Sequence, residues 1–345
     1  TAIWESWCPC RINGRCLKCG YRLAWVLVRG ETTLLGQKEV GMALTKLRLI
    51  QFRAGYNLPV HAGRAKGIFE RHGLDIEITY TPGSLYISEA LRKGEFEIGH
   101  TGADDIVADV EHFGGGPEGL FIFMGLHSGL LSIVGAPGKT TVESLRGQEL
   151  AVDARASGFV FVLEKLLRSS GFAPGDYKFV EIGGVDRRYQ ALVEGKVAGT
   201  MLLPPFTGNA VAQGCHILAR GDQIVSCYQG TVGAAKRSWA EKNRALLVSY
   251  IRAYVEATQW CFDVNNRPSC LELLAIHNGL KGKAAEETLN ALLDSGYGMY
   301  PKAELNVPGV KSVLELRAEM GYLTQPTPPA EKYIDLSYYS RAMEA

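Results

Sequence analysis

Four cysteines near the N-terminus have the residue type, and half of the spacing, of a zinc site. They are Cys8, Cys10, Cys16 and Cys19, in the pattern C-x-C-x5-C-x2-C. The second pair, C-L-K-C-G, resembles a zinc knuckle, but the first pair encloses one proline, fewer than the roughly two to four residues usual in structural zinc sites. We therefore favour the alternative that residues 1–41 are an extension without bearing on function. We predict no metal and no cofactor.

Polar and aromatic residues that follow predicted strands are the candidates for ligand binding. Loops and helix N-termini line the carboxyl edge of a parallel sheet, where such folds bind ligands. In the first half of the repeat described below, the candidates are Tyr56, Asn57, Gly83, Ser84, Thr101, Gly102 and Asp104. In the second half they are Ser157, Gly158, Phe159, Arg187, Arg188, Pro205 and Phe206. The segments between the halves add Ser128, Tyr228 and Gln229.

Several of these candidates have two roles open. Thr101 and Ser157 stand where a helix needs an N-cap, so each is expected to cap, to contact the ligand, or to do both. The remaining amides of such a helix end suit a sulfonate, carboxylate or phosphate. Asp104 either favours the first turn of a helix or pairs with a ligand amine or an arginine.

The roles of Arg187, Arg188 and the aromatic candidates are also open. Consecutive residues at a helix start cannot both face one cleft, so one arginine is predicted to lie at the surface and the other beside an anion. The aromatic candidates either sandwich a flat ligand or belong to the core. The sequence does not decide which arginine faces inward.

The composition is that of a globular protein rather than a nucleic-acid-binding one. The chain has 345 residues, of which 46% are hydrophobic and 21% charged, so it can bury a sizeable core. Its 37 Lys and Arg residues against 36 Asp and Glu give a net charge of +1, without the broad positive field that a phosphate backbone requires. The length favours two lobes.

From residue 47 strands and helices alternate, and the order recurs about a hundred residues later. The first set predicts strands at 47–52, 74–80 and 96–100, with helices at 60–72 and 84–93 and a third helix opening at 101–105. The second set predicts strands at 149–154, 177–182 and 199–203, with helices between and after them. Gly94 and Gly195 end corresponding helices. Alternating units of this kind predict parallel sheets with a ligand cleft between the two lobes.

The rest of the chain links and completes these lobes. The chain is predicted to cross between the lobes twice, once through two apolar strands within 119–134 and once through a strand at 228–235. These two crossings form a two-strand hinge. Amphipathic helices from 243 to 320 are expected to pack on lobe 1, and residues 325–329 and 333–345 to form a trailing arm. We predict lobe 1 at 42–128 plus 230–345 and lobe 2 at 129–229.

Three sequence blocks resemble a known family. They are R-A-K-G-I-F-E-R-H-G-L-D-I-E from residue 64, G-E-F-E-I-G-H-T from residue 94, and S-L-R-G-Q-E-L-A-V-D from residue 144. They are similar to the type II periplasmic solute-binding proteins of ABC transporters. Within these they resemble the NMT1/THI5-like branch, which holds sulfonate, taurine, nitrate and thiamine-pyrimidine-precursor binders. The resemblance covers residues 47 to about 322.

This resemblance implies capture of a small organic ligand, expected to be anionic or zwitterionic, and its delivery to an ABC permease in the membrane. We expect a monomer that is periplasmic or extracytoplasmic. The apolar run 23–28 is too short for an ordinary export signal, so a cytoplasmic location is the alternative.

Two other functions stay open. The fungal pyrimidine synthases share the fold family, but their cysteine-rich motif does not occur between residues 47 and 322; the four cysteines there, Cys215, Cys227, Cys261 and Cys270, are single and are predicted to be buried thiols. An intracellular ligand sensor is the third possibility. We predict that the protein is not an enzyme.

Overall fold

A computed structural model describes residues 11–12, 15–16, 21–28, 31–38, 43–156 and 158–344, with side chains from residue 43 onward. The chain divides into two compact units, Thr1–Leu44 and Thr45–Ala345. The first unit contains an antiparallel sheet in the order β1-β2-β3-β4, with strands Arg11–Ile12, Arg15–Cys16, Tyr21–Val28 and Glu31–Lys38. The apolar run at 23–28 is therefore part of a strand.

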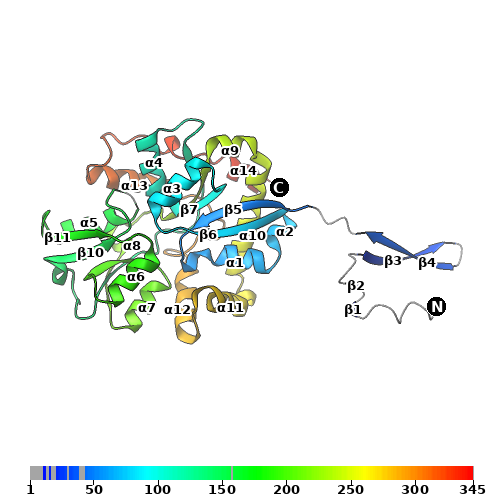
Figure 1. Ribbon diagram of the computed structural model, residues 1–345, viewed down its shortest axis with the longest axis horizontal. Coiled ribbons are helices and arrows are strands. Elements are labelled where there is room, and N and C mark those ends of the chain that lie inside the picture. Colours follow the sequence, from blue (N-terminus) through cyan, green and yellow to red (C-terminus); the bar gives the residue numbers. More distant parts are fainter. Residues whose placement is uncertain are drawn as a thin grey trace. The chain divides into compact units, whose positions relative to one another are not determined.

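The second unit is an α/β fold built around two five-stranded sheets (Figure 1). The first sheet has the order β6-β5-β7-β14-β8. Its strands are β5 Thr45–Gln51, β6 Leu74–Tyr80, β7 Ile98–Gly102, β8 Leu120–Gly125 and β14 Thr231–Lys236. Strands β5, β6 and β7 are parallel, whereas β14 runs antiparallel to both of its neighbours. In β6, Leu74 and Ile76 are buried while Asp75 and Glu77 are exposed, which is the alternation that predicted this strand.

The second sheet repeats this plan in the order β11-β10-β12-β9-β13. Its strands are β9 Ser132–Gly135, β10 Gln148–Val152, β11 Tyr177–Glu181, β12 Gly199–Leu202 and β13 His216–Arg220. Here β10 is parallel to β11 and β12, and β9 is the antiparallel strand. In each sheet the fourth strand of the order, β14 or β9, is therefore the antiparallel one, and it lies beside the last of the three parallel strands. The chain passes between the sheets twice, from β8 to β9 and from β13 to β14.

Helices follow the strands as the repeat predicts. In the first half they are α1 Leu58–Ala65, α2 Ile68–Arg71, α3 Ser84–Lys93 and α4 Ala103–Phe113. In the second half they are α5 Val160–Ser169, α6 Val185–Val193, α7 Phe206–Ala212 and α8 Gly221–Ile224. The single helix predicted at 60–72 is wrong, because Gly67 adopts the left-handed φ of 64° and separates α1 from α2. Gly94 and Gly195, at φ 72° and 69°, end the corresponding helices α3 and α6 in the same left-handed conformation.

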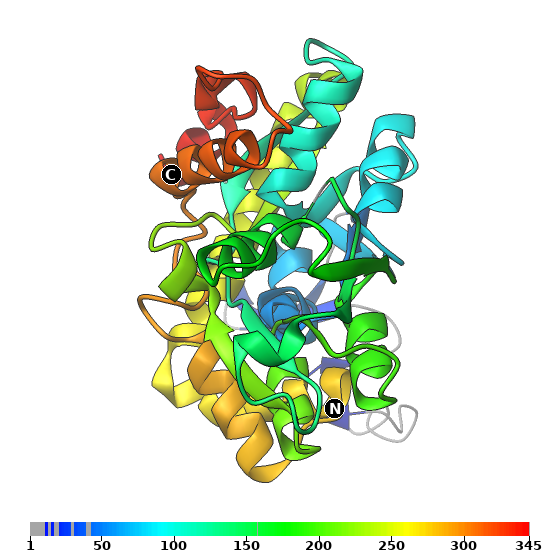
Figure 2. The same cartoon turned by 90° about the vertical axis from the view of Figure 1, so that its left-hand side faces the viewer.

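The last third of the chain is helical and touches both halves. Its helices are α9 Arg237–Lys242, α10 Arg244–Phe262, α11 Arg267–Asn278, α12 Gly282–Leu292, α13 Val307–Glu319 and α14 Ser337–Met343. Helix α10 packs on α1, α2 and α14, as expected for the first lobe. Helix α12 also lies beside α7, and α13 contacts both α4 and α5 (Figures 1 and 2). The division into lobes at 129 and 229 stays a prediction.

The C-terminal segment is not a trailing arm, so that expectation is wrong. Ile122 in β8 exchanges backbone hydrogen bonds with Tyr333 and Asp335 at 2.9 and 3.0 Å. The rings of Tyr333 and Tyr338 are buried in the core. Burial of these two aromatic side chains holds the segment on the edge of the first sheet. None of the helices in the described ranges is long and apolar enough to cross a membrane.

Candidate ligand-binding cleft

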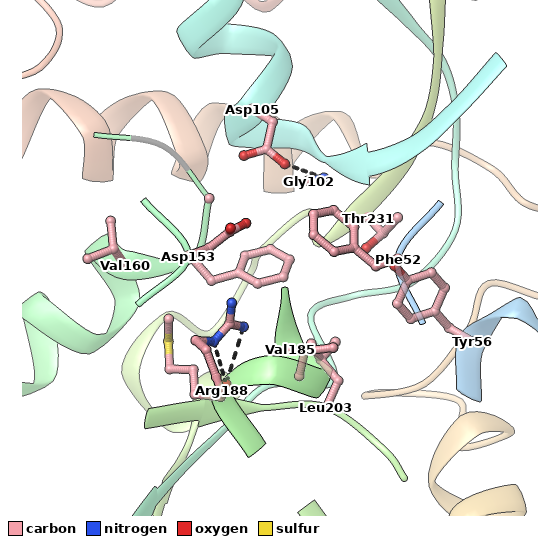
Figure 3. A pocket seen from close by; sticks show the side chains of 13 residues that line it. Phe52, Tyr56, Gly102, Asp105, Asp153, Val160, Val185, Arg188, Leu203 and Thr231 are labelled. Carbon is pink, nitrogen blue, oxygen red and sulfur yellow. Dashed lines mark hydrogen bonds between the residues drawn. The ribbon is translucent and has the colours of Figure 1, made fainter. Parts of the chain in front are cut away.

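A small cavity lies between the two sheets of the second unit, where their carboxyl edges meet (Figure 3). The first half of the fold contributes Phe52, Tyr56, Gly102, Asp105 and Thr231. The second half contributes Asp153, Gly158, Phe159, Val160, Val185, Arg188, Met201 and Leu203. The cavity volume is about 30 Å³, an order of magnitude below that of pockets for drug-sized ligands.

Arg188 supplies the positive charge of this cavity. Its side chain is 4% exposed, and its Nη1 donates to the carbonyl of Gly183 at 2.6 Å, while Nε and Nη2 donate to that of Met201 at 3.4 Å. Burial lowers the pKa of Arg188, and nearby carboxylates, Asp153 foremost, raise it. Because a guanidinium keeps its charge in proteins, Arg188 is a buried cation. Arg187 is exposed, so the structure separates the two consecutive arginines.

Asp105 organises the first-sheet side of the cavity. Its Oδ2 accepts from the Thr101 hydroxyl at 2.6 Å and from the Gly102 amide at 2.9 Å, which closes the N-terminus of α4. Thr101 is the fourth residue of β7 rather than the cap of the helix, so the expectation that it caps is wrong. The sequence was misleading here because the capping carboxylate lies four residues further on.

Thr101 and Thr200 allow a matched test of this arrangement. Both threonines are fully buried, but Thr101 donates to a carboxylate and Thr200 to the Ala151 carbonyl at 2.8 Å. We expect Thr101→Val to lower the free energy of unfolding by about 1.5–3 kcal/mol, because hydrogen bonds to charged groups are the stronger class. Thr200→Val should cost about 0.5–1.5 kcal/mol. Urea unfolding measures both, and an equal or smaller loss for Thr101→Val would refute the assignment.

Asp153 comes from the second sheet and reaches across to the first. It follows β10, and its Oδ2 accepts from the amide of Ser84, the first residue of α3, at 3.1 Å. A Cβ on Gly83 would lie 2.9 Å from Asp153 Oδ1, which explains the glycine at that position. The predicted site residues Gly83 and Ser84 thus contact Asp153, which lines the cavity, and do not line it themselves.

The structure brings five of the predicted residues into the cavity wall and leaves others elsewhere. Those in the wall are Tyr56, Gly102, Gly158, Phe159 and Arg188. Burial raises the pKa of Tyr56, so its hydroxyl stays protonated and can donate a hydrogen bond. Their contact with a ligand stays a prediction.

Three predicted residues form internal polar contacts instead. Asp104 pairs with Arg317 of α13, whose Nη1 lies 3.0 Å from Oδ2 and also donates to the Ala156 carbonyl at 3.0 Å. Burial raises the pKa of Asp104 to about 6, although Arg317 opposes this. Asn57 donates to the Phe52 carbonyl at 2.6 Å, and the amide of Gln229 bonds the carbonyls of His127 and Thr231. These side chains hold the walls rather than face the cavity.

The remaining predicted residues lie beside the cavity or away from it. Tyr228 is buried and packs edge-on against the Phe159 ring at 6.2 Å, and Phe206 packs on Tyr189 at 5.3 Å. Ser128 bonds the turn at Gly296 and Gly298, and Pro205 precedes α7. Ser157 lies outside the described residues.

Several wall residues were not among the predicted site residues. Asp153 and Phe52 each follow a strand directly, so the rule that predicted their neighbours covers them. Thr231 begins β14, and the first residue of an antiparallel strand lies at the same edge as the last residues of its parallel neighbours. Val160, Val185, Met201 and Leu203 are ordinary apolar residues that carry no signal for a site.

Four of the eight cysteines have side chains that the structure describes, so the predictions can be checked for these four. Cys215, Cys261 and Cys270 are buried free thiols and Cys227 is half-buried, so the buried-thiol prediction is confirmed for three of the four. The side chains of Cys8, Cys10, Cys16 and Cys19 lie outside the described part. Within the described ranges, no group of three or more His, Cys, Asp or Glu side chains is arranged to hold a metal.

Comparison with known proteins identifies the family to which this chain belongs. A family model described as NMT1-like matches residues 44–275. A protein of Brachyspira hyodysenteriae that carries the name of an ABC transporter periplasmic binding protein is 26% identical over 204 residues, which is 54% of this chain and 57% of that protein. The chain therefore spans little more than half the length of this relative.

Two solved structures share the fold. The periplasmic nitrate-binding protein NrtA of Synechocystis PCC 6803 superposes with a TM-score of 0.71 at 13% identity, covering 87% of this chain and 88% of that one. The aliphatic sulphonate binding protein SsuA of Escherichia coli superposes with a TM-score of 0.64 at 20% identity, covering 84% and 92%. Both likenesses show that the two-sheet architecture is the periplasmic binding protein fold.

Proposed function

Because this chain belongs to the NMT1-like family, we propose that it is a solute-binding protein that captures a small organic ligand between its two sheets. The observation that carries this proposal is the cavity itself, where the carboxyl edges of both sheets meet around one buried cation, Arg188. Such an edge is where α/β folds bind ligands. The buried guanidinium supports a ligand with an anionic group, either an anion or a zwitterion.

Capture proceeds by opening and closing of the two halves. Loops that follow strands touch directly across the cleft: the Gly55 amide donates to the Pro204 carbonyl and the Gly184 amide to the Pro82 carbonyl, both at 2.9 Å. With these contacts made, the cavity of about 30 Å³ has no room for an organic molecule of ordinary size. A ligand enters when the two strand crossings bend, and the two halves then close around it with these loops further apart than they are here.

The proposal includes the partner and the place of action. The protein acts outside the cytoplasm, in the periplasm or its equivalent, as a monomer that delivers its ligand to an ABC permease in the membrane. The name of the Brachyspira relative supports the periplasmic location and the transporter partner.

The lining of the cavity does not favour the pyrimidine-forming enzyme. The described side chains in its wall include no cysteine and no histidine, whereas the chemistry of the pyrimidine synthases depends on a cysteine-rich motif and a histidine. We therefore propose a binding protein and not a pyrimidine-forming enzyme.

Thermal unfolding of the full chain tests this function against a panel of sulfonates, aromatic carboxylates, nitrate, amino-pyrimidines and amino acids. A ligand at a hundred times its Kd adds about 2.7 kcal/mol to the free energy of unfolding, which we expect to raise the Tm by roughly 5 °C. Mass spectrometry of the denatured protein then detects any small molecule that copurifies. A folded protein that responds to no member of the panel and carries no small molecule would contradict the proposed function.

A further inference from the structure

The N-terminus of α3 is already occupied by a carboxylate of the protein. Asp153 Oδ2 accepts from the Ser84 amide at 3.1 Å, and Oδ1 lies 3.4 Å from the same nitrogen. The preceding amide, that of Gly83, donates to the Thr81 hydroxyl at 3.2 Å. Ser84 and Asp153 are 69 residues apart and belong to opposite halves of the fold. This helix end follows β6, where an anionic ligand would otherwise be stabilised by the helix dipole.

Arg188 faces the cavity with unused donors. A guanidinium has five N–H groups, and three of them donate to the carbonyls of Gly183 and Met201. The other two have no acceptor among the described residues. Figure 3 shows the guanidinium pointing from α6 toward the side of the cavity where Asp153 lies. An anionic group of a ligand therefore has one place in the cavity that is not already taken by a carboxylate.

The charges of the wall disfavour a simple anion. Among the described residues that line the cavity, Arg188 is the one cation, and Asp105 and Asp153 are two carboxylates. A bound oxyanion would add a third negative charge to a site shielded from water, where like charges repel strongly. A ligand that also carries a cationic nitrogen adds no net charge. Such a nitrogen can donate to the lone pairs of Asp153 that the Ser84 amide leaves unused.

We propose that Asp153 determines the class of ligand: it excludes simple oxyanions from the N-terminus of α3 and accepts the cationic nitrogen of a zwitterion whose anionic group binds Arg188. This inference rests on the proposed function and narrows it. It predicts that this protein differs in selectivity from the nitrate- and sulphonate-binding proteins that share its fold.

Calorimetric titration of the full chain with matched pairs of compounds tests the role of Asp153. The pairs are taurine and ethanesulfonate, β-alanine and propionate, and 4-(aminomethyl)benzoate and 4-methylbenzoate, together with nitrate alone. Each pair differs chiefly by its ammonium group. For the pair that binds, we expect the zwitterion to bind at least tenfold more tightly than the anion. Compared with the wild type, Asp153→Asn should bind the zwitterion at least tenfold more weakly and should bind the anion or nitrate more tightly.

Asp186→Asn is the matched control. Asp186 also lies close enough to Arg188 to raise its pKa, but its side chain is 36% exposed and does not line the cavity. We expect this variant to keep the preference of the wild type within threefold. Urea unfolding checks that each variant is folded, and Asp153→Ser replaces Asp153→Asn if the latter is not.

The outcomes separate the two proposals. Binding with a preference that Asp153→Asn leaves unchanged would overturn the role of Asp153 and leave the solute-binding function standing. Tighter binding of the simple anion by the wild type would do the same. A folded wild-type protein that binds no compound of the set or of the wider panel would contradict both.

Discussion

Replacement of Arg188 by methionine is expected to weaken ligand binding at least about 30-fold, whereas the same replacement of Arg187 should change it less than about threefold. The two residues are neighbours in α6, but Arg188 is 4% exposed in the cavity wall and Arg187 is exposed. Loss of one partner from a buried, hydrogen-bonded charge pair costs about 2–5 kcal/mol, and each 1.4 kcal/mol or so is tenfold in Kd. Methionine keeps much of the side-chain volume, so the loss reports charge and hydrogen bonding.

The Kd of the best compound from the panel, measured by calorimetric titration, checks this prediction. Arg187→Met controls for the change in net charge, because both variants lose one positive charge from the same helix. Circular dichroism confirms that each variant is folded, since Arg188 also bonds the Gly183 and Met201 carbonyls. Equal effects of the two substitutions would show that the cavity wall does not bind the ligand.

Acidification from pH 7 to pH 5 is expected to lower the free energy of unfolding by about 4–5 kcal/mol. His61, His100 and His127 are at most 5% exposed, and burial lowers the pKa of each to about 3. They are neutral in the folded protein, whereas an unfolded histidine takes up a proton near pH 6.5. Stability is therefore present above pH 6.5 and is lost as the pH falls, by about 2 kcal/mol per histidine at pH 5.

Asp104 opposes this loss without cancelling it. Its folded pKa of about 6 lies above its unfolded value of 3.8, so it takes up a proton in the folded protein as the pH falls. The stability from this group increases by about 1 kcal/mol between pH 7 and pH 5. The three histidines, at about 2 kcal/mol each, outweigh this gain. The net loss is a large part of the free energy of unfolding of an ordinary protein, which is roughly 5–15 kcal/mol.

Urea unfolding at pH 7, 6 and 5 measures this dependence. We expect His100→Gln, which can keep a hydrogen bond to the Tyr250 hydroxyl, to reduce the pH-dependent loss by about 2 kcal/mol. His216→Gln should leave the loss unchanged, because His216 is exposed on β13. A loss that is unaffected by His100→Gln, or a free energy of unfolding that does not change between pH 7 and pH 5, would rule out the buried histidines as its source.

Local sequence was sufficient to predict the repeat and part of the wall of the cavity between the sheets. The alternation in β6 and the glycines that end α3 and α6 act within a few residues, so they are visible in the sequence and are found in the structure. The rule that sites follow strands placed Tyr56, Gly102 and Phe159 in the cavity wall. The same local reasoning failed at Thr101, where Asp105 caps the helix, and at Gly67, where one predicted helix is two.

Tertiary structure decided what depends on segments far apart in the chain. The contact of Asp153 with Ser84 spans 69 residues and requires that the two halves face each other. That of Arg317 with Asp104 spans 213 residues and requires that α13 pack on α4. Which of two adjacent arginines points inward depends on the rotation of α6 about its axis, which the packing against β10 and β12 sets. The sequence alone thus determined the elements and the edge that we propose as the ligand site. The charges that meet at this edge, on which the proposed class of ligand rests, follow only from the way the two halves come together.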